Sequence, residues 1–473
     1  MKKAEQYAPE RDSRKTVEMD LDNTSNKNWD NDHFMHPWEC MDDLGKNDRA
    51  FIEASSGVYV TDEAGKQLID GPAGMWCVQV GYGRDEIADA MADQARKLAY
   101  FSPFNNTNSV ATRFAREVAK RAPGDLNHVF FTTGGSTAVD TALRFVHFRN
   151  NLLGKPEKKK IISRQKAYHG STYLAAAVSG KERDRLWLDK PDDLSHFLPD
   201  VNPLVRKAGQ SVAEFLDEKV ADLENAILTL GAENVAAFIA EPVLASGGVI
   251  VPPKGYHKRC IDVCHKHDVL YISDEVVTAF GRLGHWFASK DVFDIQPDII
   301  ICAKGLTSGY SPMGAAIFSD RLMADVTGAN GQGATFSNGY TYSGHPVSAA
   351  AGFASMQIIE REGLLEHVRG VTPLFQERLR ALGDLPLVVD ARGMGLMGCV
   401  QCSYDGDKNS SLENDYALGA LIDTECQEQG LVLRPIINMC VMSPPLVISE
   451  DQINQMFDIL GNAIRKVDSV KGT

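Results

Sequence analysis

Short apolar runs alternate with helical patterns from about residue 125 to residue 320, and this alternation constrains the fold more than any other feature. The apolar runs predict strands at 128–133, 159–165, 235–243, 269–276, 298–304 and 313–319, with helices at 136–151 and 256–268. Strands that are apolar on both faces and separated by helices form mostly parallel sheets covered by helices. The sequence therefore predicts a large α/β domain.

The flanking segments have a different pattern. The segment GVYVTDEAGKQLIDG (57–71) alternates around a Glu-Ala-Gly turn and predicts a hairpin, and residues 381–402 predict strand, turn and strand. We therefore expect a second, smaller α+β domain. The expected boundaries are a polar N-terminal arm at 1–35, the N-terminal part of the small domain at 36–75, the large domain at 76–345 and the C-terminal small domain at 346–473.

The net charge of −14 argues against nucleic acid as a partner, because binding to phosphates requires a basic surface. No apolar run is long enough to span a bilayer. Residues 1–32 are polar throughout and lack the apolar stretch of a signal peptide. We therefore expect a cytoplasmic protein with neither a membrane nor a nucleic acid as its partner, and with a flexible N-terminal arm.

The nine cysteines are scattered, and two spacings among them resemble functional motifs. Cys399 and Cys402 form a C-x-x-C pattern, but the alternation around them predicts a strand. Cys260 and Cys264 stand one helical turn apart, and two histidines follow them. No second ligand pair occurs at zinc-binding spacing, so we expect a helix that buries its cysteines and exposes its histidines, and no metal site.

Lys304 stands two residues beyond the apolar run Ile299–Cys302, where a buried strand is predicted to end. A desolvated ammonium group costs several kcal/mol unless it is paired or deprotonated. A lysine in this position therefore needs a specific role. Sites in open α/β sheets lie at the carboxyl ends of the strands, so polar residues at other strand ends are candidates to lie near it.

Three further polar features stand at predicted strand ends. They are a pair of glycines followed by Ser136, the carboxylates Asp274 and Glu275, and the pair Tyr168 and His169. Glycines at a helix start let backbone amides approach an anion, and the helix N-terminus favours negative charge. Taken singly, each feature has an ordinary structural explanation. The glycines and Ser136 could simply begin a helix, the carboxylates could form a cap or an ion pair, and Tyr168 could be a surface aromatic.

Together the four features match the requirements of pyridoxal phosphate. Its aldehyde needs an amine with a lowered pKa, which Lys304 would supply. Its ring nitrogen needs a carboxylate, so that the protonated ring accepts electrons. Its phosphate needs a helix N-terminus, and its ring needs an aromatic neighbour. The constellation therefore predicts a pyridoxal phosphate site in which Lys304 forms the Schiff base.

At these residues the chain resembles the class III pyridoxal-phosphate-dependent aminotransferases, which have the type I aminotransferase fold. The motifs AYHGSTYLAAAVSG, AEPVLASGGVIVPPKGYHKRC, ISDEVVTAFGRLG, PDIIICAKGLTSGYSPMGA and YTYSGHPVSAAAG occur in order and at family-like spacing. The resemblance extends from about Trp38 to the C-terminus. It implies an α/β fold with a large domain, built on a mostly parallel sheet covered by helices, and a smaller α+β domain.

The resemblance also implies roles for individual residues. Lys304 would bind the cofactor and later carry a proton between the substrate Cα and the cofactor C4′. Asp274 would pair with the pyridinium nitrogen. Tyr168 would stack on one face of the ring, and Val276 would lie on the other. Glu241 matches the family's Glu-Pro pair and is expected to support the site from behind.

Phosphate binding is assigned by the resemblance to the amides of Gly135 and Ser136 and to the Ser136 hydroxyl. Thr341 matches the family threonine that reaches the phosphate held by the neighbouring subunit. This implies a homodimer, or a tetramer of such dimers, with sites that are incomplete in a monomer. One position departs from the family, because Thr137 stands where a glutamate is usual. The backbone amides survive this change, and the role of the lost carboxylate stays open.

Within class III, the segments GPAGMWCVQVGYGR and LVLRPIINMCVMSPPLVIS resemble the ω-amino acid and amine:pyruvate transaminases. Trp76 would then form a wall of the substrate pocket. Arg434 would pair with the carboxylate of a 2-oxo acid and swing away when an uncharged amine is bound; a structural ion pair is the alternative. Phe104, Ser246 and Tyr168 are expected to line the same pocket, with packing roles as the alternative.

The resemblance implies a ping-pong transaminase that moves an amino group from a primary amine or ω-amino acid to pyruvate through the pyridoxamine form of the cofactor. Three alternatives stay open from the residues alone. They are a decarboxylase or aminomutase of the same fold, an aminotransferase that uses 2-oxoglutarate, and a non-catalytic cofactor-binding protein. The last would be expected to lose Lys304 or Asp274 or to add a DNA-binding module, and neither is seen.

Overall fold

The computed structural model of this chain describes residues 23–406 and 415–470. Most of the predicted N-terminal arm, residues 1–22, lies outside the described residues. The chain divides into two units. One extends to Ala54 and includes Thr61–Lys66, and the other comprises Ser55–Val60 and the chain from Gln67 onwards. The predicted boundaries of the arm, the large domain and the small domain stay predictions.

The first unit contains the last third of the predicted arm, which forms helix α1 (Asn23–His33), and a short 3-10 turn at Met41–Asp43. Arg49 forms an ion pair with Glu39 at 2.6 Å and lies 3.7 Å from Asp30. His36 also contacts Asp30, at 2.9 Å. These polar contacts connect helix α1 to the segment that follows it.

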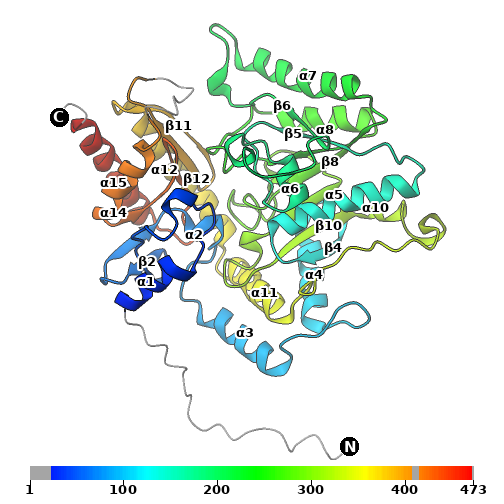
Figure 1. Ribbon diagram of the computed structural model, residues 1–473, viewed down its shortest axis with the longest axis horizontal. Coiled ribbons are helices and arrows are strands. Elements are labelled where there is room, and N and C mark those ends of the chain that lie inside the picture. Colours follow the sequence, from blue (N-terminus) through cyan, green and yellow to red (C-terminus); the bar gives the residue numbers. More distant parts are fainter. Residues whose placement is uncertain (1–22, 407–414, 471–473) are drawn as a thin grey trace, which may run out of the picture. The chain divides into compact units, whose positions relative to one another are not determined.

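A seven-stranded sheet forms the centre of the second unit (Figure 1). In spatial order its strands are β4 (Leu126–Thr132), β10 (Gly314–Ser319), β9 (Ile299–Cys302), β8 (Leu270–Asp274), β7 (Val235–Ala240), β5 (Lys160–Arg164) and β6 (Ser195–Leu198). β10 runs antiparallel to both of its neighbours, and the other pairs are parallel. The prediction of a mostly parallel sheet is confirmed.

Helices cover this sheet and complete its core. They are α3 (Asp85–Lys97), α4 (Ser109–Arg121), α5 (Gly135–Leu152), α6 (Tyr173–Val178), α7 (Val212–Leu230), α8 (Tyr256–Lys266), α9 (Ala288–Asp291), α10 (Asp320–Ala324) and α11 (Pro346–Arg361).

Successive residues of β9 face opposite sides of the sheet. Ile301 belongs to a buried cluster that includes Val139 of α5, whereas Ile300 belongs to one that includes Phe114 of α4. Strands buried on both faces read as continuous apolar runs. This is why continuous apolar runs in the sequence predicted these strands.

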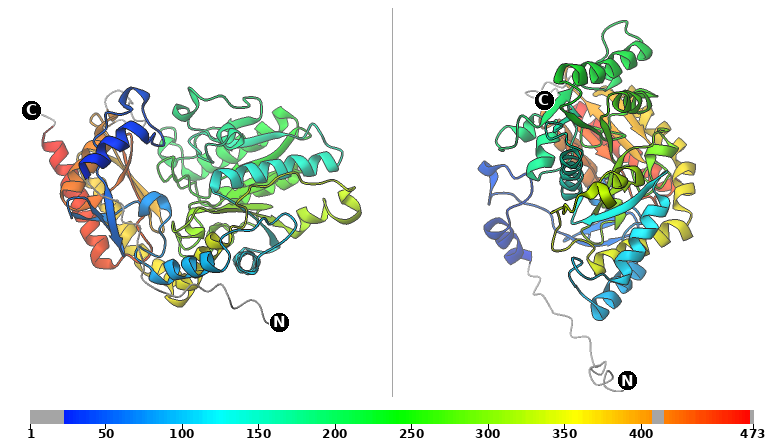
Figure 2. Two further views of the ribbon diagram at one scale, coloured as in Figure 1. Left: turned by 60° about the horizontal axis from the view of Figure 1, so that its bottom comes forward. Right: turned by 90° about the vertical axis from the view of Figure 1, so that its right-hand side faces the viewer.

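A second, four-stranded antiparallel sheet lies in the C-terminal part of the same unit (Figure 2). Its strands, in spatial order, are β11 (Val388–Met394), β12 (Met397–Cys402), β15 (Met439–Met442) and β14 (Arg434–Ile436). The helices α12 (Leu364–Ala381), α14 (Leu418–Glu428) and α15 (Glu450–Ser469) pack with it. The predicted strand–turn–strand at 381–402 is confirmed by β11 and β12.

The N-terminal and C-terminal chain meet in a third sheet. Its strands are β1 (Ile52–Ser56), β2 (Tyr59–Asp62), β3 (Gln67–Asp70) and β13 (Leu431–Val432). The strands β2 and β3 match the hairpin predicted at 57–71. β3 pairs in parallel with β13, with Leu431 opposite Ile69. The segment before α2 (Ala73–Trp76) is thereby fixed to the segment that leads to Arg434.

The predicted burial of the cysteines is confirmed, but of the two histidines predicted to be exposed only His265 is, whereas His267 is partly buried. Cys399 and Cys402 lie buried in β12, and Cys260 and Cys264 are buried on α8. Within 23–406 and 415–470, no three His, Cys, Asp or Glu side chains are grouped so that they could hold a metal ion. No helix in these ranges has both the length and the apolar character needed to cross a membrane.

Candidate active site

Lys304 follows the end of β9 and begins a short 3-10 turn, Lys304–Leu306. Its φ angle is +45°, in the left-handed region that side chains other than glycine rarely adopt, and such strain collects at functional sites. A Cβ atom on the next residue, Gly305, would lie 2.8 Å from the side chain of Gln79. The turn is therefore closely packed, and the direction of the lysine side chain is fixed by its surroundings.

The side-chain amine of Lys304 makes no hydrogen bond or ion pair with any described residue. Burial lowers the pKa of Lys304, while the nearby charges of Asp274 and Glu241 raise it and that of Arg434 lowers it further. A lowered pKa increases the fraction of neutral amine, which is the nucleophilic form. The site thus holds an unpaired lysine suited to react with a carbonyl group.

Asp274 ends the neighbouring strand β8 and is almost completely buried. One carboxylate oxygen lies 2.7 Å from Nδ1 of His169, and the other accepts a hydrogen bond from the backbone N–H of Val276 at 3.1 Å. The next residue, Glu275, accepts hydrogen bonds from Ser289 and from the Ala288 N–H. The two adjacent carboxylates therefore have different surroundings, and the charge of Asp274 raises the pKa of Lys304.

Glu241 joins two segments behind Lys304. Its carboxylate accepts hydrogen bonds from the backbone N–H groups of Tyr168, at 3.0 Å, and Ala245, at 3.1 Å. Burial raises the pKa of Glu241, an effect that the neighbouring charge of His169 opposes. The backbone of the Tyr168 segment is thus held in place by a buried carboxyl group, and the predicted supporting role of Glu241 toward a cofactor stays a prediction.

Helix α5 begins at Gly135, and no side chain caps its N-terminus. A Cβ atom on Gly135 would approach both terminal carbons of Val276 to 3.3 Å. Gly170 has a φ of +132°, and a Cβ atom there would lie 2.5 Å from Oγ of Ser136. Because side chains are excluded on two sides, the backbone amides at the start of the helix stay open. An uncapped N-terminus of an 18-residue helix fits a phosphate group.

Thr137, where the family usually has glutamate, acts within the first turn of α5. Its hydroxyl donates to the carbonyl of Gly134 at 2.9 Å and lies 3.3 Å from the hydroxyl of Thr133. The Ser136 hydroxyl accepts a hydrogen bond from the N–H of Ser171 at 3.1 Å. The threonine therefore braces the turn locally, and the amides of the cradle do not depend on a carboxylate at this position.

Arg434 begins β14 and is partly buried. Its guanidinium group makes no hydrogen bond or ion pair with any described residue. Burial lowers the pKa of Arg434, and the charges of Tyr168 and Asp184 oppose this effect. The Tyr168 hydroxyl lies 2.9 Å from that of Ser171. The structure therefore brings an unpaired cation into electrostatic reach of Lys304, 130 residues away in the sequence.

Trp76 and Ser246 lie in different surroundings. Trp76 is 1% exposed, has a φ of +65° and packs in a buried cluster that includes Val243 and Val277. Its indole N–H has no hydrogen-bond partner among the described residues. Ser246 lines a pocket of about 330 Å³ together with Lys181 and Met439. Their roles as pocket walls stay predictions.

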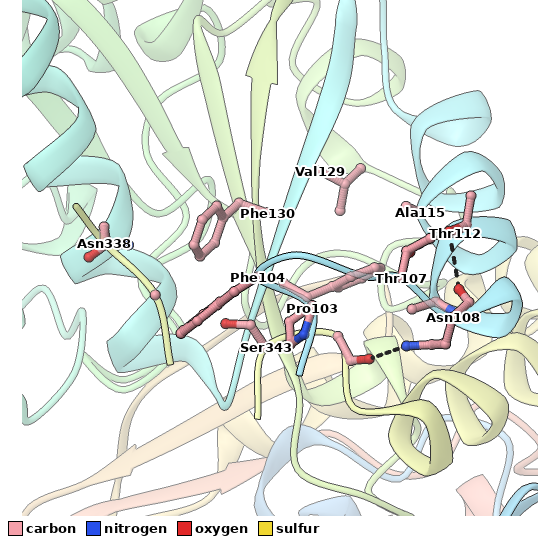
Figure 3. Close-up of a pocket in the computed structure, with 14 residues that line it drawn as sticks. Pro103, Phe104, Thr107, Asn108, Thr112, Ala115, Val129, Phe130, Asn338 and Ser343 are labelled. Atoms are coloured by element: carbon pink, nitrogen blue, oxygen red, sulfur yellow. Dashed lines mark hydrogen bonds between the residues drawn. The ribbon is translucent and has the colours of Figure 1, made fainter. Parts of the chain in front are cut away.

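Phe104 lies in a second pocket, of about 320 Å³, shown in Figure 3 with Phe130 and Asn338. No residue that lines this pocket belongs to the group around Lys304. Phe104 is 70% exposed. Thr341 is also exposed, and its carbonyl accepts a hydrogen bond from the Tyr100 hydroxyl at 2.7 Å. The roles of Phe104 and Thr341 stay predictions.

His169 is the residue whose contribution the sequence did not reveal. It stands beside Tyr168 at a predicted strand end, which marks it as polar at a possible site, but nothing local indicates its partner. In the structure its ring is fully buried against Asp274. A histidine in this position can fix the orientation of the carboxylate.

Comparison with known proteins identifies the family. The profile described as Aminotransferase class-III matches residues 42–464, so the chain belongs to the class III aminotransferases. It is a pyridoxal-phosphate-dependent enzyme that uses an amine donor and an oxo acid acceptor. The predicted family, cofactor and type I aminotransferase fold are confirmed.

Relatives with a named activity differ in substrate. A putrescine–pyruvate aminotransferase of Pseudomonas aeruginosa is 36% identical over 446 residues, covering 93% of this chain and 96% of that protein. The mitochondrial gamma-aminobutyrate transaminase 1 of Oryza sativa subsp. indica is 36% identical over 425 residues, covering 88% and 81%. The crystal structure of an (S)-enantioselective omega-transaminase from Thermomicrobium roseum has a TM-score of 0.90 at 32% identity, covering 94% of this chain and 98% of that one.

Proposed function

We propose that this enzyme moves an amino group from a primary amine or ω-amino acid to a 2-oxo acid, with pyruvate as the acceptor, by a ping-pong mechanism. The observation that carries the proposal is the combination of two unpaired basic side chains within electrostatic reach of each other. Lys304 has a lowered pKa beside Asp274, and Arg434 has no partner among the described residues. The first suits reaction with a carbonyl, and the second suits recognition of a carboxylate.

We assign the residues as follows. When bound, pyridoxal phosphate supplies an electron-accepting ring. Lys304 would hold the cofactor by its aldehyde carbon, and its freed amine would carry a proton between the substrate Cα and the cofactor C4′. Asp274, oriented by His169 at 2.7 Å, keeps the ring nitrogen protonated. The amides of Gly135 and Ser136 hold the phosphate.

The remaining site residues position the ring and the substrate. Tyr168, held by Glu241 through its backbone N–H, covers one ring face, and Val276, packed beside the glycine that begins α5, lies on the other. Trp76 and Ser246 bound the substrate. Excluding water from such a site strengthens every charge interaction in it.

A visible-absorption titration tests the proposed function. The purified enzyme with pyridoxal phosphate is mixed with one amine at a time, without oxo acid, and then with pyruvate or 2-oxoglutarate. We expect an amine to bleach the absorption band of the lysine-bound cofactor and pyruvate to restore it, with alanine as product. Restoration by 2-oxoglutarate alone would contradict the choice of acceptor. A band that no amine in a broad panel bleaches would contradict the transaminase assignment itself.

Replacement of Arg434 by alanine is expected to raise the KM for pyruvate far more than the KM for an uncharged amine. Loss of a charged hydrogen-bonding partner weakens binding by roughly 10- to 150-fold. Only the oxo acid presents a carboxylate, so only its half-reaction loses this contact. Steady-state kinetics with both substrates varied measure the two constants. Equal changes in both would assign Arg434 a structural role instead.

We also propose that the enzyme acts as a homodimer in the cytoplasm. Support comes from exposed aromatic side chains that a partner could cover, with Phe101 55% exposed, Phe104 70% and Tyr342 57%. Phe104 lines a pocket that contains none of the residues assigned to the cofactor, and Thr341 matches the family threonine that reaches the phosphate of the neighbouring subunit, so we assign both to the site of the partner.

A further inference from the structure

Lys181 follows helix α6 and is held against the segment that carries Tyr168. The intervening Gly180 donates its N–H to the carbonyl of Ala167 at 2.9 Å, and its own carbonyl accepts from the N–H of Lys166 at 3.0 Å. A Cβ atom on Gly180 would overlap the carbonyl oxygen of Arg164. Only glycine allows this approach. The backbone therefore fixes the point from which the Lys181 side chain extends.

The amine of Lys181 lies 5.6 Å from the centre of the Tyr168 ring, a distance at which a cation is attracted to a ring face. Its side chain is only 16% exposed. Asp184 is 3.7 Å away, too far for a hydrogen bond, and is shared with Arg183 at 3.3 Å. The amine makes no hydrogen bond with any described residue, so it keeps its capacity to donate three.

The pocket of about 330 Å³ that contains Ser246 is also lined by Lys181. Burial lowers the pKa of Lys181, and the charge of Arg434 acts in the same direction, whereas Asp184 and Glu241 oppose it. Lys181 and Arg434 are thus two incompletely neutralised cations within electrostatic reach of each other. An anionic group bound by Lys181 would relieve this repulsion, and a further ammonium group there would add to it.

We propose that Lys181 is a specificity-determining residue that binds a carboxylate remote from the reacting amine, so that the enzyme favours ω-amino acids over diamines as donors. The proposal rests on the transaminase function proposed above and names the donor class for the same site. Arg434 remains the contact for the acceptor carboxylate. Lys181 adds a second contact, on the side of the pocket formed by the Tyr168 segment.

Three donors with the same four-carbon chain test this inference, namely 4-aminobutanoate, 1-aminobutane and 1,4-diaminobutane. They differ only in the distal group, which is an anion, a methyl group or a cation. We expect the wild-type kcat/KM, with pyruvate as fixed acceptor, to be highest for 4-aminobutanoate and lowest for 1,4-diaminobutane. In Lys181→Met, the ratio of kcat/KM for 4-aminobutanoate to that for 1-aminobutane should fall by about 10-fold or more.

Lys166→Met is the matched control, because it removes the same charge from the lining of the same pocket. Lys166 is half exposed and already paired with Asp200 at 2.7 Å, so its loss should leave the donor ratio unchanged. Lys181→Arg, which keeps the charge, should retain most of the preference for 4-aminobutanoate. Methionine keeps most of the length and apolar character of the lysine side chain while removing its charge.

Binding of butanoate, which cannot react, gives a readout independent of turnover. We expect its dissociation constant, measured by calorimetry on the pyridoxal phosphate enzyme, to rise about 10-fold or more in Lys181→Met and not in Lys166→Met. The inference would be overturned if Lys181→Met lowered kcat/KM equally for 4-aminobutanoate and 1-aminobutane, or if both substitutions changed the dissociation constant of butanoate equally. A wild-type kcat/KM that is highest for 1,4-diaminobutane would also overturn it. Failure of the wild type with all three donors would contradict the proposed function instead.

Discussion

Lys304→Ala is expected to abolish transamination while leaving the protein folded. Proton transfer by a positioned group contributes about 10²- to 10⁴-fold to a rate, and the same amine is also the nucleophile, so we expect turnover to fall by about 10⁴-fold or more. Lys304 makes no hydrogen bond or ion pair with the described residues, so its removal breaks no structural contact. The measurements are single-turnover and steady-state rates, with circular dichroism to monitor folding.

The visible spectrum provides the control for Lys304→Ala. The absorption band of the lysine-bound cofactor should be lost, while Lys166→Ala, at an exposed and paired lysine, should keep both band and activity. Retained steady-state turnover in folded Lys304→Ala would remove this residue from its assigned role. A lost band with full activity would contradict the covalent part of that role alone.

Lys304→Ala can also test the proposed dimer, in an experiment that mixes two kinds of subunit. Thr341→Glu should impair the enzyme, because a carboxylate repels phosphate. If Thr341 completes the site of the neighbouring subunit, a hybrid of Lys304→Ala and Thr341→Glu chains contains one fully intact site. Random mixing of two inactive proteins would then restore about one quarter of the sites. A Thr341 that served its own chain would restore none.

The second large effect is expected for Asp274→Asn. The replacement keeps the size of the side chain and an acceptor for the Val276 N–H, but removes the negative charge that is assigned to the ring nitrogen. Loss of one preorganised electrostatic group costs about 10²- to 10³-fold in kcat, and we expect a decrease of this size. The half-reaction with an amine, followed by stopped-flow absorbance, measures it directly.

Glu275 offers a matched comparison, since it is the adjacent carboxylate. It accepts hydrogen bonds from Ala288, Ser289 and Thr278 and is fully buried. Glu275→Gln replaces one acceptor oxygen by a donor, so we expect it to lower the free energy of unfolding by about 1–3 kcal/mol. Asp274→Asn also replaces a buried acceptor oxygen, beside His169, so it should cost some stability as well, but of the two variants only Asp274→Asn should lower the rate of the amine half-reaction in the folded enzyme. The opposite pattern would contradict the assignment of Asp274 to the reaction.

Local patterns in the sequence determined the strands of the central sheet and the position of Lys304. The apolar runs are continuous because β7, β8, β9 and β10 are buried on both faces. The residues of such a strand are therefore enough to predict it. The motifs, in their order along the chain, identified the family. The cradle at the start of α5 was also readable, because it needs only consecutive glycines before a helix.

Contacts between distant segments were decided only by the tertiary structure. His169 and Asp274 are 105 residues apart, and no periodicity in either segment indicates that one orients the other. Lys181 stands in the charged segment KERDR (181–185), and its place in the pocket depends on the close approach of Gly180 to Arg164. Such pairings depend on how loops cross at the ends of the strands. The sequence identified the residues that can do the chemistry, whereas packing selected the charges that surround them.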